Sequence, residues 1–289
     1  MPRIWTKFQQ GILGKLPQKK LNVLLSIPLV SSLIKKKIKS GLGLQEARNI
    51  FTGAAPTPVS TLKWFERLSI PIQEAYAMTE NCCYSHVTLN DGIKFGYVGK
   101  ALPHCEVKLS EDNEILIKHV ALMDGYYKED KQTQDTIKDG WLHTGDEGHI
   151  DAEGYLKITG RVKDLFKTSK AKYVAPAPIE MKLSANKNIE QVCVVGTGLP
   201  QPIALITLSE YGKSRPVEDV YGSLETTLNI VNPKFESHER LKKIVVLDKE
   251  WTIENNLLTP SMKIKRNEVE RLYKDNYTTW YDKDGHIVS

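Results

Sequence analysis

The sequence predicts an α/β domain with a β subdomain, followed by a smaller α+β domain. Three observations support this prediction: a strand–turn–helix–strand pattern over residues 50–75, two hairpin patterns after Gly96, and mixed strands and helices after Asp164. A length of 289 residues fits one large or two ordinary domains. The hydrophobic content of 40% is normal for a globular protein.

The first pattern places two loops close together. Residues 50–52 end a buried strand, Gly53 begins a sharp turn, and Thr57 is a plausible N-cap with Pro58 at the first helical position. Apolar residues then recur at helical spacing through Leu68, and residues 70–75 form a second strand. The loops 52–55 and 75–80 follow neighbouring strands, so both face the crevice in which open α/β sheets bind ligands.

The later elements follow from alternation and from turn residues. We expect hairpins over residues 106–118 and 149–158, with turns at 111–114 and 151–154. The C-terminal part should contain short helices over 178–183 and 267–273, a longer helix over 217–231, and strands over 192–195, 203–206 and 243–247. Residues 276–289 are polar, and we expect a peripheral tail. The boundary near Gly160–Asp164 gives domains over residues 1–162 and 163–289.

Composition excludes some classes of protein. No apolar run reaches the ~18 residues of a membrane span, and no signal-peptide pattern follows Met1, so we expect a cytoplasmic protein. The four cysteines have no zinc or disulfide spacing, which predicts ordinary reduced thiols. The net charge of +5 is mild.

Lysines flank the apolar segment Leu21–Ile34, with Lys19 and Lys20 before it and Lys35, Lys36, Lys37 and Lys39 after it. The pattern predicts two amphipathic helices around Pro28. They could pack on the core with a solvated lysine face, or they could contact an anionic membrane surface. No aromatic residues alternate with the lysines, so we expect no nucleic-acid partner.

Four motifs occur in a fixed order along the chain. They are Tyr76-Ala77-Met78-Thr79-Glu80, the run Trp141–Asp146, the run Gly160–Lys167, and the run Pro260–Arg266. Together they resemble the adenylate-forming enzymes, specifically the AMP-forming long-chain acyl-CoA synthetases, over residues 2 to about 266. The long-chain assignment rests on three further runs: Pro2-Arg3-Ile4-Trp5, Val174-Ala175-Pro176 and Leu258-Thr259-Pro260.

The resemblance implies a fold and a reaction. The fold is an incomplete α/β nucleotide-binding domain with a β subdomain, followed by a small α+β lid. The reaction activates a fatty acid with ATP and Mg²⁺ to an acyl-adenylate, which coenzyme A then converts to a thioester while AMP leaves.

The resemblance also implies the nucleotide site. Small residues in the turn Thr52-Gly53-Ala54-Ala55 would let adenine approach the backbone, and Glu74, Ala75 and Tyr76 would complete the pocket. Asp146 and Arg161 would contact the ribose, because two acceptor oxygens match a vicinal diol. Thr79 would bond a phosphate oxygen and Glu80 would hold Mg²⁺. Each residue also has an ordinary structural explanation: a turn, a core aromatic ring or a surface charge.

Three lysines would act in the lid. Lys163 occupies the pivot between the domains, and Lys167 would face the acyl-adenylate during thioester formation. Lys263 would bridge the carboxylate and the α-phosphate during adenylation, a task that suits a mobile ammonium group.

The chain also departs from the family pattern. The family's Ser/Thr/Gly-rich phosphate-binding loop is not found, Ala77 replaces a glycine, and Ala171 stands where glycine is usual beside the pantetheine arm of coenzyme A. The methyl of Ala77 could narrow the acyl channel or strain the loop. We therefore expect an activity that is crippled or depends on a complementing N-terminal chain. The alternatives are half of a split enzyme and a non-catalytic module that binds AMP or acyl-adenylate.

Overall fold

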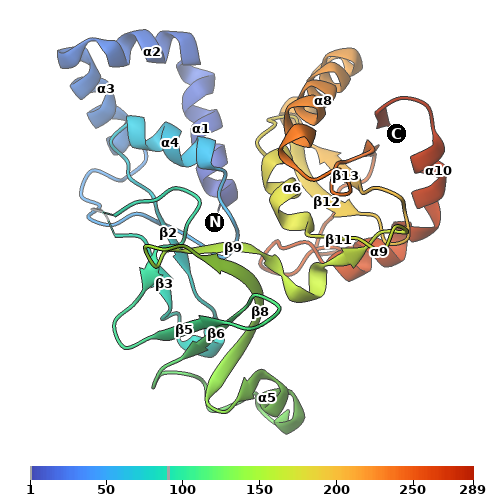
Figure 1. The fold of residues 1–289 in the computed structure, drawn as a ribbon. Helices are drawn as coiled ribbons and strands as arrows, with labels where there is room; N and C mark the ends of the chain where they lie inside the picture. The colour runs from blue at the N-terminus through green and yellow to red at the C-terminus, as the bar shows by residue number, and fades with distance from the viewer. Residues whose placement is uncertain (1, 90–91) are drawn as a thin grey trace. The chain divides into compact units, whose positions relative to one another are not determined.

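The computed structural model describes residues 2–89 and 92–289, with side chains from Ile4 onward. The side chains of Pro2 and Arg3, on which part of the long-chain assignment rests, lie outside the described residues. The chain forms two compact units, Met1–Ile158 and Thr159–Ser289 (Figure 1). The predicted division at residues 162 and 163 stays a prediction.

Four helices begin the first unit. They are α1 (Pro2–Lys15), α2 (Gln18–Ser26), α3 (Pro28–Gly41) and α4 (Val59–Arg67). Trp5 of α1 packs edge-on against Phe65 of α4, with ring centroids 5.3 Å apart, and both side chains are buried. The predicted pair of helices around Pro28 is confirmed.

A four-stranded sheet carries the turn at Gly53. Its order is β1 (Phe51–Thr52), β2 (Gln73–Tyr76), β3 (His86–Val87) and β4 (Lys100–Ala101). β1 and β2 are parallel, so the predicted strand–turn–helix–strand unit is confirmed. Two details are wrong. Phe51 is exposed in β1 rather than buried. The N-cap of α4 is Pro58 rather than Thr57. The buried hydroxyl of Thr57 instead forms a hydrogen bond of 2.9 Å with the buried hydroxyl of Thr52.

A second sheet forms the predicted β subdomain. It contains β5 (Glu106–Leu109), β6 (Glu114–Lys118), β7 (Ile137–Lys138), β8 (Trp141–Ile150) and β9 (Leu156–Arg161), with α5 (Asp130–Thr136) before β7. Both predicted hairpins are confirmed, since β5 pairs antiparallel with β6 and β8 pairs with β9. Buried Ile115, Ile117, Leu142 and Leu156 form its core.

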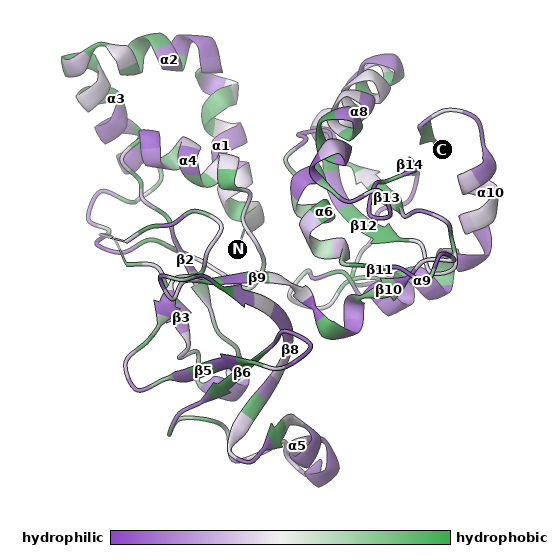
Figure 2. Ribbon diagram, in the orientation of Figure 1, coloured by the Kyte–Doolittle hydropathy of each residue, from purple (hydrophilic) through white to green (hydrophobic). Residues whose placement is uncertain are grey.

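The second unit is built on a sheet buried on both faces. Its strand order is β12 (Ile189–Val195), β13 (Ile203–Leu208), β14 (Lys243–Leu247) and β15 (Ile287–Val288). The helices are α6 (Pro176–Leu183), α7 (Glu210–Lys213), α8 (Val217–Val231), α9 (Arg266–Tyr273) and α10 (Tyr277–Asp282), and β10 (Phe166–Lys167) pairs with β11 (Tyr173–Val174). Ala204 and Ile206 face α6 and α8, whereas Ile203 and Leu205 face α9 and α10. Burial on both faces explains the continuous apolar runs Val192–Val195 and Ile203–Ile206, and much of β12 is green in Figure 2.

The prediction of a peripheral tail is wrong. Tyr277 and Trp280 are buried in the core beneath β13, and β15 pairs with β14. The many polar residues of this segment conceal the few large side chains that pack.

Within residues 2–89 and 92–289, no helix has the length and apolarity needed to cross a bilayer.

Candidate active site

The turn after β1 lies against the end of β2. A Cβ atom added at Gly53 would stand 3.0 Å from the carbonyl oxygen of Ala75, so a side chain there would crowd the neighbouring strand. Ala54 follows with a left-handed φ of 66°. Of the residues predicted from the sequence, Gly53 and Ala75 therefore lie close together through their backbones, and Thr52 is the strand partner of Glu74. Such small residues leave room for a flat ring to approach the chain.

Glu74 is directed into the unit. Its Oε2 accepts a hydrogen bond of 2.8 Å from the amide of Gly96, and its own amide donates to Thr88 Oγ1 at 2.8 Å. Burial raises the pKa of Glu74 to about 7, opposed by the hydrogen bond from Gly96. The carboxyl group therefore fastens β2 to the segment around Gly96.

Tyr76 and Asp146 meet although 70 positions separate them in sequence. The Tyr76 hydroxyl donates a hydrogen bond of 2.8 Å to Asp146 Oδ2. The Tyr76 ring lies 6.2 Å from the ring of His86, which is buried, and burial lowers the pKa of this histidine to about 4. The structure thus brings together two residues from different motifs, and a neutral imidazole lies beside them at neutral pH.

Glu114 shapes the segment that carries Asp146. Its Oε1 accepts a hydrogen bond of 2.8 Å from the amide of Gly145, and its Oε2 lies 2.9 Å from His143 Nδ1. The register between β6 and β8 shifts here, and Gly145 has a φ of 69°. A bulge of this kind re-aims a side chain along a strand. Sequence reasoning placed Glu114 only in a turn and missed this role.

Thr79 and Glu80 begin a short 3-10 helix, Thr79–Asn81. The hydroxyl of Tyr126 donates a hydrogen bond of 2.9 Å to Glu80 Oε1, and the amide of Met123 donates to the Glu80 carbonyl oxygen at 2.8 Å. Burial and the Glu80 carboxylate raise the pKa of Tyr126. Thr79 is exposed. Sequence reasoning missed Tyr126, which fixes the orientation of Glu80 from a segment without any motif.

The metal-ligating capacity of this region is small. Within the described residues, no group of three or more His, Cys, Asp or Glu side chains could hold a metal ion. Glu80 supplies one carboxylate, and its bond with Tyr126 uses one of the two oxygens. This fits Mg²⁺ bound chiefly by phosphate oxygens, since Mg²⁺ often takes only one or two protein carboxylates.

The remaining predicted residues belong to the second unit. Arg161 ends β9, Lys163 lies in a 3-10 turn over Val162–Asp164, and Lys167 lies in β10; all three side chains are exposed. Lys167 Nζ lies 5.6 Å from the ring centroid of Tyr173, its partner in β11.

Lys263 lies at the closing end of a short loop. A bridge between Leu258 and Ile264 closes the loop, and Thr259 and Lys263 exchange hydrogen bonds of 2.8 and 3.0 Å. Met262 has a left-handed φ of 63°, which turns the chain before Lys263. The Lys263 side chain is exposed. The backbone of the loop is thus fixed, and the lysine extends from it.

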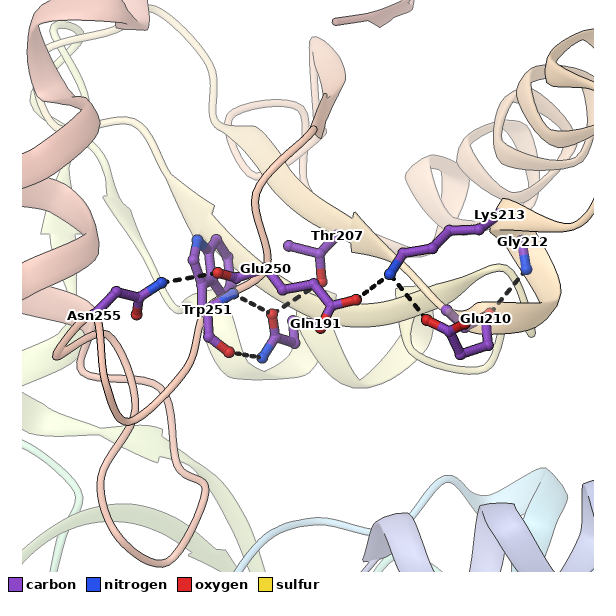
Figure 3. Close-up of polar contacts among 9 residues, drawn as sticks. Gln191, Thr207, Glu210, Gly212, Lys213, Glu250, Trp251 and Asn255 are labelled. Atoms are coloured by element: carbon purple, nitrogen blue, oxygen red, sulfur yellow. Dashed lines mark hydrogen bonds and ion pairs between the residues drawn. The ribbon is translucent and has the colours of Figure 1, made fainter.

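A polar cluster, with Gln191, Thr207 and Trp251 buried, anchors the beginning of the segment that leads to this loop (Figure 3). Gln191 of β12 donates to the carbonyl oxygen of Trp251 at 2.7 Å and accepts from the amide of Trp251 at 2.9 Å. Thr207 donates to the same Gln191 oxygen at 2.9 Å. Asn255 donates to the carbonyl oxygen of Glu250, whose carboxylate forms an ion pair with Lys213. Sequence reasoning missed Gln191, because its partner is 60 positions away.

Arg266 anchors the end of the loop. Its guanidinium donates to Glu180 Oε1 at 2.6 Å and to the Val194 carbonyl oxygen at 2.7 Å, and it lies 3.6 Å from Asp164 Oδ2. The Glu180 carboxylate raises the pKa of Arg266 against the effect of burial, so the guanidinium stays charged. One side chain thus joins the segment around Asp164, α6, β12 and the loop of Lys263.

Comparisons with known proteins agree with the family resemblance of the four sequence motifs. Residues 2–127 match the model of the AMP-binding enzyme family, and residues 163–285 match the AMP-binding enzyme C-terminal domain. The chain is 29% identical to the long-chain-fatty-acid–CoA ligase ACSBG2 of Xenopus laevis, covering 99% of this chain and 47% of that protein. It is 28% identical to the long-chain-fatty-acid–CoA ligase FadD15 of Mycobacterium bovis, covering 87% of this chain and 45% of that protein.

The fold agrees with a solved structure as well. The crystal structure of the anthranilate CoA ligase AuaEII in complex with anthranoyl-AMP matches with a TM-score of 0.69 and 21% identity, over 81% of this chain and 46% of that chain. The chain spans about half the length of the curated relatives that it matches. It belongs to the adenylate-forming superfamily of AMP-binding enzymes. Within that superfamily its relatives are long-chain fatty-acid–CoA ligases.

Proposed function

We propose that this chain takes part in the ATP-dependent activation of a long-chain fatty acid to an acyl-adenylate and then to an acyl-CoA. The observation that carries the proposal is the 2.8 Å hydrogen bond from Tyr76 to Asp146, beside the close backbone contact of Gly53 with Ala75. Two motifs distant in sequence meet here. They bring together the aromatic ring of Tyr76 and the carboxylate of Asp146, which would contact the adenine and the ribose of a bound adenosine.

The nucleotide would lie along this region. The turn Thr52–Ala55 and the end of β2 would receive the adenine, with Tyr76 beside the base. The carboxylate of Asp146 would accept hydrogen bonds from the two ribose hydroxyls. The bond from Tyr76 would hold that carboxylate in a fixed orientation, which reduces the entropy lost on binding. Arg161 would provide the second ribose contact.

Thr79 and Glu80 would serve the phosphates. Thr79 is exposed, and its hydroxyl would donate to a phosphate oxygen. Glu80, oriented by Tyr126, would hold Mg²⁺ together with phosphate oxygens. When bound, the metal would neutralise negative charge on the phosphate oxygens.

The two half-reactions need positive charge at different moments. In the first, a carboxylate oxygen of the fatty acid forms a bond to the α-phosphorus and the bond to pyrophosphate breaks. In the second, the thiol of coenzyme A attacks the acyl carbon, loses its proton, and AMP leaves. Lys263 would stabilise the first transition state and Lys167 the second, with the pivot at Lys163.

Binding of a non-hydrolysable acyl-adenylate tests the proposal. An acyl-sulfamoyl adenosine should bind more tightly than ATP, as measured by calorimetry. Asp146→Ala should weaken it by about 1–3 kcal/mol, the range for hydrogen bonds to a charged group. Asp112→Ala, in the exposed turn between β5 and β6, is the matched control and should leave the affinity unchanged. Equal affinity of both variants would remove Asp146 from the site.

Measuring pyrophosphate exchange separates an enzyme from a binding module. Binding of the analogue without exchange, even in the presence of a complementing chain, would favour a non-catalytic module that binds AMP or acyl-adenylate. Exchange that appears only with a complementing chain would favour half of a split enzyme.

A further inference from the structure

We propose that α2 and α3 form a docking surface for an anionic phospholipid bilayer, with the corner at Ile27 and Pro28 entering the headgroup region. This surface lies outside the candidate active site, and the proposal does not depend on nucleotide binding. If the proposed function holds, docking would place the chain where long-chain fatty acids are dissolved.

The charge of this region differs from that of the remaining chain. Residues 1–45 contain nine basic residues and no acidic residue. The rest of the chain has 31 basic and 35 acidic residues, so all of the excess positive charge belongs to this segment. A region of one sign attracts a surface of the opposite sign, and an anionic leaflet is such a surface.

The inner faces of the two helices are already packed. Leu21 of α2 is buried, and Ile34 and Ile38 of α3 pack against the same core. The indole of Trp64 in α4 donates to Gln18 Oε1 at 2.8 Å, and Arg67 of α4 donates to Asn22 Oδ1 at 2.9 Å. The orientation of α2 and α3 is therefore fixed, and their outer faces are defined.

The outer faces combine apolar and basic side chains. Val23 is 62% exposed, Leu29 is 83% exposed and Leu33 is 69% exposed, and Ile27 is exposed at the corner between them. On α3, Leu29 and Leu33 lie on one face of the helix with Lys36, Lys37 and Ser40. A shallow groove on this face is lined by Leu33, Lys36, Lys37 and Ser40. On α2, Lys19 precedes Val23 and Ile27 at intervals of four. Figure 2 shows the resulting mixture of apolar and polar residues along both helices.

This order of side chains fits a bilayer. The apolar residues gather at the corner, and lysines lie on both sides of it, at Lys19 and Lys20 and at Lys36 and Lys37. Long lysine side chains can reach phosphate groups while the leucines enter the acyl boundary. A folded protein partner would have to match four exposed lysines with acidic groups of fixed geometry, whereas mobile headgroups adjust to them. The occupant that the charges and the apolar corner favour is therefore an anionic bilayer.

Sedimentation with lipid vesicles tests the proposal. The 289-residue protein should bind vesicles of phosphatidylcholine mixed with phosphatidylglycerol, and it should bind pure phosphatidylcholine at least about tenfold more weakly. Binding should decrease as NaCl is raised from about 0.1 M to about 0.5 M. The double variant Lys36→Glu/Lys37→Glu should lose at least about 25-fold in partition coefficient, since each basic residue at the surface contributes about fivefold and the new carboxylates are repelled by the anionic lipid. Leu29→Ser/Leu33→Ser should lose more than about tenfold.

The controls distinguish a surface from a general charge effect. Lys249→Glu/Lys274→Glu changes the net charge equally at two exposed lysines of the second unit and should bind like the wild type. Hydrogen exchange in residues 22–34 should slow when anionic vesicles are added. An equal loss in both lysine variants, or binding that does not depend on anionic lipid, would overturn the proposal. So would slowed exchange of residues 22–34 in concentrated protein without lipid, which would indicate a protein contact.

Discussion

Two buried titratable groups on neighbouring strands should give opposite pH dependences that cancel in the wild type. Glu74 on β2 is buried, and its pKa is raised from 4.5 to about 7 by desolvation. His86 on β3 is buried, and its pKa is lowered from 6.5 to about 4 by desolvation. Each shift opposes the charged form of its group in the folded state.

The signs follow from the protons bound in each state. Between about pH 4.5 and 7 the folded chain keeps a proton on Glu74 that the unfolded chain releases, so this contribution to the free energy of unfolding falls as pH rises. Between about pH 4 and 6.5 the unfolded chain holds a proton on His86 that the folded chain lacks, so this contribution rises with pH. At 1.36 kcal/mol per pKa unit, each contribution changes by about 3 kcal/mol.

Glu74→Gln should expose the histidine contribution. The glutamine carbonyl oxygen can still accept the hydrogen bond from Gly96, so the variant should match the wild type below about pH 4.5 and exceed it by about 3 kcal/mol above about pH 7.5. His86→Asn, which keeps an acceptor or donor for Ser85, should show the opposite slope: its free energy of unfolding relative to the wild type should fall between about pH 4 and 6.5.

Urea unfolding followed by tryptophan fluorescence at a series of pH values measures these differences. Subtracting the wild-type curve removes the contribution of the second unit, which neither substitution touches. Glu66→Gln, at an exposed position of α4, is the control and should differ by less than about 0.5 kcal/mol at every pH. A Glu74→Gln difference that stays constant within about 0.5 kcal/mol would refute the reasoning from desolvation.

Three further predictions concern the second unit. Arg266→Gln should lower the free energy of unfolding by about 3 kcal/mol, because it leaves the Glu180 carboxylate without its partner. Urea unfolding of a double-mutant cycle with Glu180→Gln should give a coupling energy above about 1 kcal/mol, and additive effects would contradict a stabilising Arg266–Glu180 ion pair. Ala171→Gly should raise the free energy of unfolding by about 0.5–1 kcal/mol in urea, since it relieves a left-handed φ of 59°; no gain would show that the loop relaxes. In a preparation that performs both half-reactions, Lys263→Ala should slow pyrophosphate exchange by at least about 100-fold and Lys167→Ala should mainly slow thioester formation; equal losses in both would contradict separate roles.

Periodicity predicted most of the elements because burial on one face leaves a regular pattern. The hairpins of the β subdomain and the helix at Val217–Val231 follow from the spacing of apolar residues and from turn residues between them. The C-terminal segment was mispredicted because Tyr277 and Trp280 pack from a polar background, and β15 has only two residues. Its pairing with β14 is set by the tertiary structure rather than by local propensity.

Motifs identified candidate residues but not the residues that orient them. Asp146, Glu80 and Lys263 lie in recognisable runs of sequence. Their supports, among them Glu114 and Tyr126, belong to unremarkable segments. A hydrogen bond between positions tens of residues apart leaves no periodic signal, so a single sequence could not reveal it.

The structure also separates two departures from the family pattern that look alike in the sequence. An alanine replaces a glycine at both Ala77 and Ala171. Ala171 has a φ of 59°, where a Cβ atom meets the backbone, so its methyl costs free energy in the fold. Ala77 is not among the described non-glycine residues with positive φ, so its methyl requires no such strain. Two effects were expected for the methyl group of Ala77: strain of the loop and a narrower acyl channel. A left-handed φ does not strain the loop at Ala77, so the expected effect that remains is the space that the methyl group occupies. An effect of Ala77→Gly should appear in the affinity for acyl groups of different width, whereas an effect of Ala171→Gly should appear first in stability.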